Sequence, residues 1–323
     1  MEVNLSDSIK RELLKIIQKE FPLEERPFLK IAQKLNIGEN EVIEILRDLQ
    51  KNKIIRQISA IFNPWFFGHQ SALFAFEVPL KRIKEVASII NRHPGVTHNY
   101  LRNHKYNLWF ILVSPPERDL LEEVKKLASI CKIKKYLYLP ALRIFKISTV
   151  FEEDFTNFEK EESMKITYNF TEWDKILVKK LQEPLALVEN PFKEIANSLG
   201  IDQKELFSWI KKMKQKGGLR RFGALLKHDK VGFKTNVMIA WEIEKEKIDS
   251  LIEKLSKHLF ITHCYERKSY PYWKYNFYTM CHFKREQEKE KIYFLAQELD
   301  IKKFLLLETL KEFKKIRLKL FYD

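Results

Sequence analysis

An internal repeat spans nearly all of the 323 residues and constrains the fold more than any other feature. The motif RQISA at 56–60 returns as RRFGA at 220–224, and THNYLR at 97–102 returns as THCYER at 262–267. Because the shift is 164 positions for the first motif and 165 for the second, the chain contains two copies of one two-part unit. A repeated fold requires the same apolar spacing in each copy, but not the same His, Tyr and Arg. We therefore expect these polar residues to carry function.

The first part of each copy has the pattern of a winged helix-turn-helix. Residues 9–17, 28–35 and 39–49 carry apolar side chains at helical spacing, and 54–61 alternates like a strand. Three helices with a short turn before the third and a strand after it are typical of this motif. Copy two repeats the apolar positions 164 residues later: Phe192, Ile195, Ala196, Leu199 and Ile201.

The second part of each copy predicts a ferredoxin-like βαββαβ unit. In copy one, strands are expected near 71–78, 96–102, 107–113 and 133–139, with helices near 80–92 and 117–130. In copy two, strands are expected near 235–243, 261–267, 275–283 and 301–307, with helices near 246–257 and 284–298. The predicted class is α+β. The predicted domains are 1–62 and 169–226 (winged helix-turn-helix), 63–150 and 227–323 (ferredoxin-like), and a linker at 151–168.

Composition favours a globular cytoplasmic protein. Hydrophobic residues make up 45% of the chain, and no apolar run approaches the roughly 18–20 residues of a membrane span. The N-terminal residues lack the basic and apolar regions of a secretory signal. The three cysteines have no metal-ligand spacing and do not form a disulfide framework. We therefore expect no membrane association.

The net charge of +15 has two interpretations, nucleic-acid binding or a lysine-rich composition bias. A winged helix-turn-helix usually places its third helix in the major groove of DNA. Here that helix carries Glu39, Glu41, Glu44 and Asp48, which would face a polyanion. Its counterpart begins with acidic residues and has its lysines late. We therefore expect a structural or dimerising role for these units and no specific DNA partner.

The repeated strand motif predicts a binding surface. Alternate side chains of a strand share one face, so His98, Tyr100 and Arg102 project together, as do their repeats. The next strand is expected to add further polar and aromatic groups, and the wing arginines can close over such a wall. A flat, aromatic, polyanionic ligand fits this description. The predicted substrate-binding residues are Arg56, His98, Tyr100, Arg102, Asn107, Trp109, Arg220, Arg221, Trp241, Arg267, Asn276 and Tyr278.

A structural role is the alternative for each of these histidines. A lone histidine on a strand usually has structural partners, but the recurrence of His, Tyr and Arg at His98 and His263 favours function. His228 and His282 have no counterpart in copy one, so the two copies have diverged there. Cys264 has no adjacent base in the sequence and is expected to pack rather than to act as a nucleophile.

At these motifs the chain resembles a known family. Each half is similar to the Lrp/AsnC-type regulators, and the motifs more specifically resemble those of the siroheme decarboxylases. The resemblance rests on RQISAIF at 56–62 and HPGVTHNY at 93–100 in copy one, and on the run from His263 to Met280 in copy two. The chain looks like both subunit types fused. Copy one departs from the pattern at Gln57, where a second arginine is expected.

The resemblance implies removal of the acetate carboxyl groups at C12 and C18 of siroheme, giving 12,18-didecarboxysiroheme for haem or haem d1 synthesis, with no added cofactor. It implies an intramolecular pseudo-dimer and leaves a further homodimer open. Copy two is the expected main site, because it keeps both wing arginines and has His228 and His282, which copy one lacks. The alternative is a transcriptional regulator that senses a haem-like ligand. The predicted catalytic residues are His263, Tyr265, His228 and His282, with His263 or His228 as the iron ligand.

Overall fold

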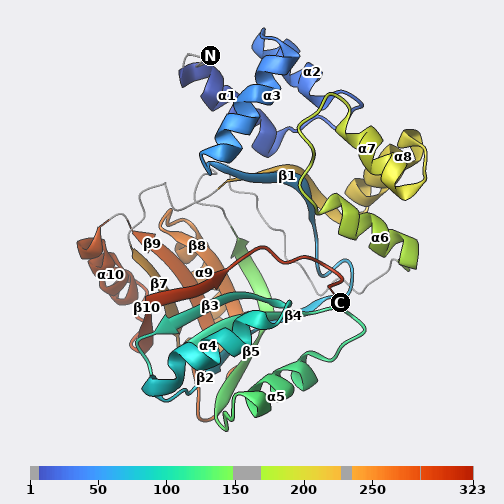
Figure 1. Ribbon diagram of the computed structural model, residues 1–323. Coiled ribbons are helices and arrows are strands. Elements are labelled where there is room, and N and C mark those ends of the chain that lie inside the picture. Colours follow the sequence, from blue (N-terminus) through green and yellow to red (C-terminus); the bar gives the residue numbers. More distant parts are fainter. Residues whose placement is uncertain (1–6, 148–168, 227–234, 284, 323) are drawn as a thin grey trace. The chain divides into compact units, whose positions relative to one another are not determined.

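The computed structural model describes residues 7–147, 169–226, 235–283 and 285–322 (Figure 1). The helices are α1 (Asp7–Lys19), α2 (Pro27–Leu35), α3 (Glu39–Lys51), α4 (Ile83–Arg92), α5 (Leu120–Ile130), α6 (Glu172–Leu181), α7 (Pro191–Leu199), α8 (Gln203–Gln215), α9 (Ile248–Ser256) and α10 (Glu290–Glu298). The strands are β1 (Ile55–Phe62), β2 (Gln70–Phe76), β3 (Val96–Arg102), β4 (Leu108–Ser114), β5 (Tyr136–Ile147), β6 (Leu219–Leu226), β7 (Thr235–Trp241), β8 (Ile261–Arg267), β9 (Phe277–Phe283) and β10 (Phe304–Lys315). None of the helices described is long and apolar enough to span a membrane.

The chain divides into two units, each built from both copies. The winged-helix unit comprises Met1–Gly68, Ile166–Val231 and Lys319–Phe321. The barrel unit comprises His69–Lys165, Gly232–Leu318 and Tyr322–Asp323. Like parts of the two copies therefore associate with each other, which confirms the predicted α+β repeat and the expected association of the copies.

In the winged-helix unit, each copy contributes three helices and one strand. Proline begins the second helix of each copy, where a missing backbone N–H costs nothing, and a residue with positive φ ends it (Asn36 or Gly200). The strands β1 and β6 pair antiparallel, with Ser59 opposite Gly223. A side chain on Gly223 would meet the carbonyl oxygen of Ile17 at 2.6 Å, so α1 approaches the ribbon too closely for a larger residue.

In the barrel unit, eight antiparallel strands close in the order β10-β3-β4-β2-β5-β8-β9-β7. Each copy supplies four neighbouring strands, with two helices on the outer face of its sheet. The copies join edge to edge, because β5 pairs with β8 and β10 pairs with β3. Closure leaves neither sheet with an open edge.

The last strand of each copy is longer than the sequence predicted. We expected these strands to end near 139 and 307, but β5 runs to Ile147 and β10 to Lys315. The first part of β5 pairs with β2 of its own copy, and the remainder pairs with β8 of the other copy. The additional residues are held by a partner more than 100 positions away, which local sequence patterns do not report.

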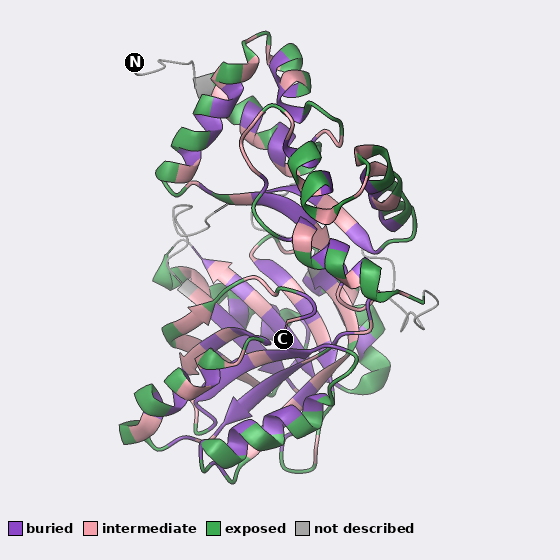
Figure 2. Cartoon of the chain, turned by 45° about the vertical axis from the view of Figure 1, so that its right-hand side comes forward, coloured by how far each residue is buried: buried purple, intermediate pink, exposed green. Residues whose placement is uncertain are grey.

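Three apolar clusters fill the barrel unit. Two of them lie between the sheet and the helices, one in each copy, around Phe110 and around Phe277. The third fills the barrel interior around Trp109, Leu137, Tyr278 and Leu307. Figure 2 shows the result: the strands are largely buried, while the outer faces of the helices are exposed.

Candidate active site

Two matching rows of polar side chains line the inside of the barrel. On β3 the His98 and Tyr100 rings lie 6.1 Å apart, and the Arg102 guanidinium lies 5.3 Å from the Tyr100 ring centre. On β8 the His263 and Tyr265 rings also lie 6.1 Å apart, and the Arg267 guanidinium lies 4.7 Å from the Tyr265 ring. The predicted shared face of each motif is therefore present. Each row runs from a histidine at one end of the barrel to an arginine at the other.

The arginines of the two rows join the copies. Arg267 donates from Nη1 to the carbonyl oxygen of Leu139 on β5, at 2.7 Å. Arg102 makes the equivalent bond to Leu307 on β10, at 2.5 Å. Both side chains are buried, and burial lowers the pKa of Arg102 to about 10 and also lowers that of Arg267. Arg102 Nη1 also donates to the Thr309 hydroxyl at 3.2 Å. Substrate binding by these two arginines stays a prediction, and their observed hydrogen-bond partners belong to the opposite copy.

Aromatic residues fill the arginine end of the barrel. The Trp273 indole N–H donates to the Tyr278 hydroxyl at 2.6 Å, and that hydroxyl donates to the Tyr275 carbonyl at 3.3 Å. The Trp109 indole N–H donates to the Tyr106 carbonyl at 2.6 Å. Burial raises the pKa of Tyr278. Trp109 and Tyr278, both predicted to bind substrate, are close-packed with their neighbours, so a macrocycle cannot enter at this end without displacing these side chains.

Asn107 and Asn276 bind the backbone just before the first helix of their own ferredoxin-like half. The Asn107 amide donates to the Val78 carbonyl at 2.8 Å and accepts from the Val78 N–H at 3.1 Å. Asn276 makes the same two bonds with Ile243, at 2.8 and 2.9 Å. Both residues precede their strands rather than lying on them. Their amide groups are thus used in the fold, and a role in substrate binding stays a prediction.

Trp241 lies on the opposite face of the sheet from the two rows. It is fully buried in the cluster between the sheet and the helices of copy two, and its indole N–H donates to Thr279 Oγ1 at 3.0 Å. Trp241 is thus a core residue in this structure, and substrate binding by it stays a prediction. On β7 it alternates with Ala240 and Met238, which face the barrel interior.

The histidine end of the barrel brings histidines and lysines together. Burial lowers the pKa of His98 to about 4, helped by the charge of Lys315. Burial lowers the pKa of His263 to about 3, and the charges of His282, His98, Lys146 and Lys315 lower it further. Both imidazoles are therefore neutral near pH 7. They are half-buried, unlike the apolar residues in the middle of the barrel.

Each of these histidines is held by the threonine before it. Thr97 Oγ1 lies 2.9 Å from His98 Nδ1, and Thr262 Oγ1 lies 2.7 Å from His263 Nδ1. Both threonines are buried. These hydroxyls were not among the predicted site residues, although threonine recurs in both copies of the motif.

His282 distinguishes copy two from copy one. On β9 it lies directly opposite Asn236 of β7, and its Nδ1 is 2.5 Å from Asn236 Oδ1. The same register in copy one pairs Val113 with Ser71. The histidine end is therefore more polar on the copy-two side, and the two copies differ at this position. His228, the other histidine specific to copy two, lies outside the described residues.

The wing arginines have partners within the winged-helix unit. Arg220 stacks on Trp65, 5.1 Å from guanidinium to ring centre. Arg221 donates from Nη1 to the Gln18 carbonyl at the end of α1, at 3.2 Å. Gln57 makes the equivalent bond to the Gln182 carbonyl after α6, at 3.0 Å. Arg56 is exposed. Carboxylate binding by Arg56, Arg220 and Arg221 stays a prediction.

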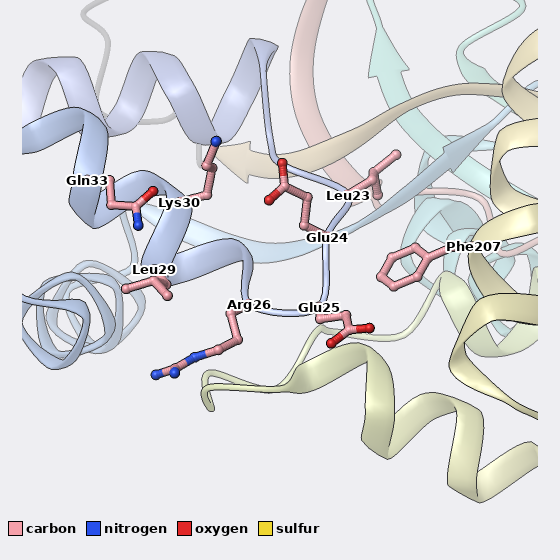
Figure 3. Close-up of a pocket in the computed structure, with 8 residues that line it drawn as sticks. All are labelled: Leu23, Glu24, Glu25, Arg26, Leu29, Lys30, Gln33 and Phe207. Carbon is pink, nitrogen blue, oxygen red and sulfur yellow. The ribbon is translucent and has the colours of Figure 1, made fainter.

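A surface pocket of about 560 Å³ lies in the winged-helix unit, and none of its lining residues is a predicted site residue (Figure 3). It is lined by Phe207 of α8 and by residues 23–33 around the start of α2. Carboxylates of Glu24 and Glu25 stand beside the cations of Arg26 and Lys30, so the pocket has no single sign of charge. It does not resemble a site for a polyanion.

The described cysteines and acidic groups offer no metal site. Cys131, Cys264 and Cys281 are buried free thiols, and burial raises the pKa of Cys264 to about 12. Within the described ranges, no three His, Cys, Asp or Glu side chains are placed to hold a metal ion. Cys264 thus has the packing role that the sequence predicted, in the outer cluster of copy two.

Comparison with known proteins identifies the family. Residues 10–56 and 174–220 match the siroheme decarboxylase NirDL-like HTH domain, and residues 66–146 and 230–314 match the AsnC-like ligand binding domain. The siroheme decarboxylase of Hydrogenobacter thermophilus is 36% identical over 317 residues, which cover 97% of this chain and 95% of the relative. The chain belongs to the siroheme decarboxylase family.

Other relatives extend the comparison. The crystal structure of the siroheme decarboxylase NirDL in complex with an iron-uroporphyrin III analogue superposes with a TM-score of 0.78 at 33% identity, covering 97% of this chain and 95% of that one. The siroheme decarboxylase alpha subunit of Desulfovibrio desulfuricans is 40% identical over 151 residues, which cover 46% of this chain and 85% of the subunit. The chain thus has the length of the fused relatives and about twice that of the separate subunit.

Proposed function

We propose that this protein removes the C12 and C18 acetate carboxyl groups of siroheme to give 12,18-didecarboxysiroheme. The observation that carries the proposal is the pair of His–Tyr–Arg rows inside a barrel of siroheme decarboxylase type. Siroheme is a flat iron tetrapyrrole with eight carboxylates. It needs a site with positive charge, aromatic surface and a group that can meet iron.

The histidine end of the barrel is the part of the described structure that fits this ligand. The arginine end is filled by packed aromatic side chains. At the histidine end, Lys315 is exposed and its charge acts on both His98 and His263. A bound carboxylate there would be attracted by this lysine. It would also favour protonation of the nearby imidazoles, whose pKa burial has lowered.

The reaction needs one proton for each carboxyl group lost. The bond between the acetate methylene carbon and the carboxyl carbon breaks, CO2 leaves, and the electron pair that remains on the methylene carbon takes up a proton to give a methyl group. An acid close to that carbon accelerates the step by about 10²- to 10⁴-fold. We assign this role and iron ligation among His263, His282 and His228, with Tyr265 orienting a carboxylate or relaying the proton.

Copy two is proposed as the main site. It has His282 and Asn236 where copy one has Val113 and Ser71. The fused chain forms its own pseudo-dimer in the barrel, as separate subunits would do between chains. The reaction needs no cofactor beyond the iron of siroheme, takes place in the cytoplasm, and serves haem or haem d1 synthesis.

Two measurements test the proposal against a regulator that only senses a haem-like ligand. Siroheme is titrated into the protein under anaerobic conditions while the absorption spectrum is followed. The tetrapyrrole is then extracted and its mass is measured by mass spectrometry. Spectral binding followed by a mass decrease of two CO2 supports the enzyme. Binding with an unchanged mass supports the sensor and contradicts the enzyme.

A further inference from the structure

In copy two, a directed chain of hydrogen bonds ends at His263. The Thr262 hydroxyl oxygen lies 3.3 Å from the Met280 carbonyl oxygen and 2.7 Å from His263 Nδ1. A carbonyl oxygen can only accept, so the hydroxyl proton points toward Met280. The hydroxyl oxygen then has to accept from the imidazole. His263 Nδ1 therefore carries the ring proton.

The position of the proton on Nδ1 decides whether Nε2 of His263 carries a proton or a lone pair. When Nδ1 of a neutral imidazole is protonated, Nε2 has a lone pair and no proton. Among the described residues, His263 Nε2 has no hydrogen-bond partner. Partners behind a histidine commonly set the tautomer of metal-binding imidazoles in this way.

We propose that Thr262 is a positioning residue that holds His263 as the Nδ1–H tautomer, so that Nε2 offers its lone pair to the siroheme iron. This inference rests on the proposed function, because it assigns how one residue of that site meets the substrate. Neutral His263 in this tautomer has no proton on the nitrogen that faces the ligand. The proton that replaces CO2 then comes from another acid of the site.

Copy one provides a matched comparison. Thr97 Oγ1 lies 2.9 Å from His98 Nδ1, and this is the one hydrogen bond of its hydroxyl among the described residues. The position of Met280 is taken by Ile111, which lies opposite His98 as Met280 lies opposite His263. The Thr97 hydroxyl is free to turn its proton toward the imidazole. The hydrogen bond between Thr97 and His98 therefore does not fix the tautomer of His98.

The test is nitrogen NMR of the ligand-free protein with ¹⁵N-labelled histidine. Eight histidines are present, and the His263→Gln variant identifies the His263 signals. We expect a protonated Nδ1 and an unprotonated Nε2 in His263, the reverse of the tautomer that imidazole prefers in water. In Thr262→Val the proton should move to Nε2, Thr262→Ser should keep the wild-type signals, and Thr97→Val should leave them unchanged.

Protonated Nε2 in the wild type, or identical His263 signals in Thr262→Val, would overturn the inference. A second readout uses bound siroheme: its absorption bands should shift in Thr262→Val, return in Thr262→Ser and stay in place in Thr97→Val. Unshifted bands in Thr262→Val would also count against it. The outcomes separate the two claims. A decarboxylase with Nε2–H refutes only the tautomer, whereas the expected tautomer in a protein that leaves siroheme intact refutes only the proposed function.

Discussion

Arg267 Nη1 lies 2.7 Å from the carbonyl oxygen of Leu139, so a side chain of copy two donates into the last strand of copy one. The bond from Arg102 to Leu307 repeats this in the opposite direction. Both pairs lie where the copies meet edge to edge. The arginines of the repeated motif are therefore placed to hold the two copies together.

Replacing Arg267 by methionine should lower the free energy of unfolding by about 1.5–3 kcal/mol, the usual worth of a hydrogen bond from a charged donor. The Leu139 carbonyl would lose its partner, although methionine would fill part of the space. Chemical denaturation measures the change. Arg92→Met, the same substitution at an exposed helix end, is the control and should have little effect. Equal losses in both variants would show that Arg267 does not join the copies.

The Arg221→Gln variant removes the positive charge of the side chain but should keep its hydrogen bond to the end of α1. Glutamine at the equivalent Gln57 already donates to a helix-end carbonyl, so the variant should keep the bond to Gln18 and the stability of the unit. If Arg221 holds a carboxylate, siroheme affinity should fall about ten- to a hundred-fold, because a charge-assisted bond is worth roughly 1.5–3 kcal/mol. A spectral titration measures this. Unchanged affinity would leave Arg221 with its helix-end role alone.

Stability should fall when the pH drops from about 6.5 to about 4. In the folded protein the pKa of His98 is about 4 and that of His263 about 3, whereas both are near 6.5 in an unfolded chain. Between these values the unfolded chain binds more protons, so acid favours unfolding, and the stabilisation is complete above pH 6.5. Each group contributes at most about 1.4 kcal/mol per pH unit.

Denaturant titrations at several pH values test this dependence. The His98→Gln and His263→Gln variants should each show a shallower loss of stability on acidification. A slope that is the same in both variants and in the wild type would mean that neither imidazole is buried as described.

Specific DNA binding should be weak. The exposed face of α3 carries Glu44 and Asp48, and its Arg47 donates to the Leu187 carbonyl of copy two at 2.9 Å. Phosphate binding depends on free cations on this helix. Fluorescence anisotropy with the protein's own promoter DNA should show loss of binding as salt rises. A sequence-selective complex that resists salt would contradict the structural role of the winged-helix unit.

Much of the fold was predictable because the two copies show the same residue pattern, so each copy supports the prediction made for the other. The strand alternation of His98, Tyr100 and Arg102 placed these residues on one face, and the second copy confirmed the pattern. The partners of Arg102 and Arg267 were not predictable, because they belong to strands of the other copy. Local patterns do not encode a pairing between strands more than 100 residues apart.

Three of the predicted substrate-binding residues do not extend the wall that Trp109 and Tyr278 form, for physical reasons, and substrate binding by them stays a prediction. Trp241 follows Ala240 on β7, so the two side chains lie on opposite faces of the sheet. Ala240 faces the barrel interior and Trp241 faces the helices. Asn107 and Asn276 each lie two residues before Trp109 and Tyr278, so strand alternation predicts the same face for them. Both asparagines precede the strands, however, and their amides bind nearby backbone groups. Side chains alternate between faces only within a strand. The strand predicted from 107 begins one residue later, at Leu108, and the strand predicted from 275 begins two residues later, at Phe277.

Decarboxylation of siroheme by this barrel can be observed by mass analysis of the tetrapyrrole in a single-turnover reaction. Purified protein is mixed anaerobically with siroheme, with no added cofactor, and the extracted tetrapyrrole is weighed over time beside a sample without protein. We expect an intermediate lighter by one CO2 and a final product lighter by two. Siroheme that stays bound with its original mass would show that the protein is not a siroheme decarboxylase.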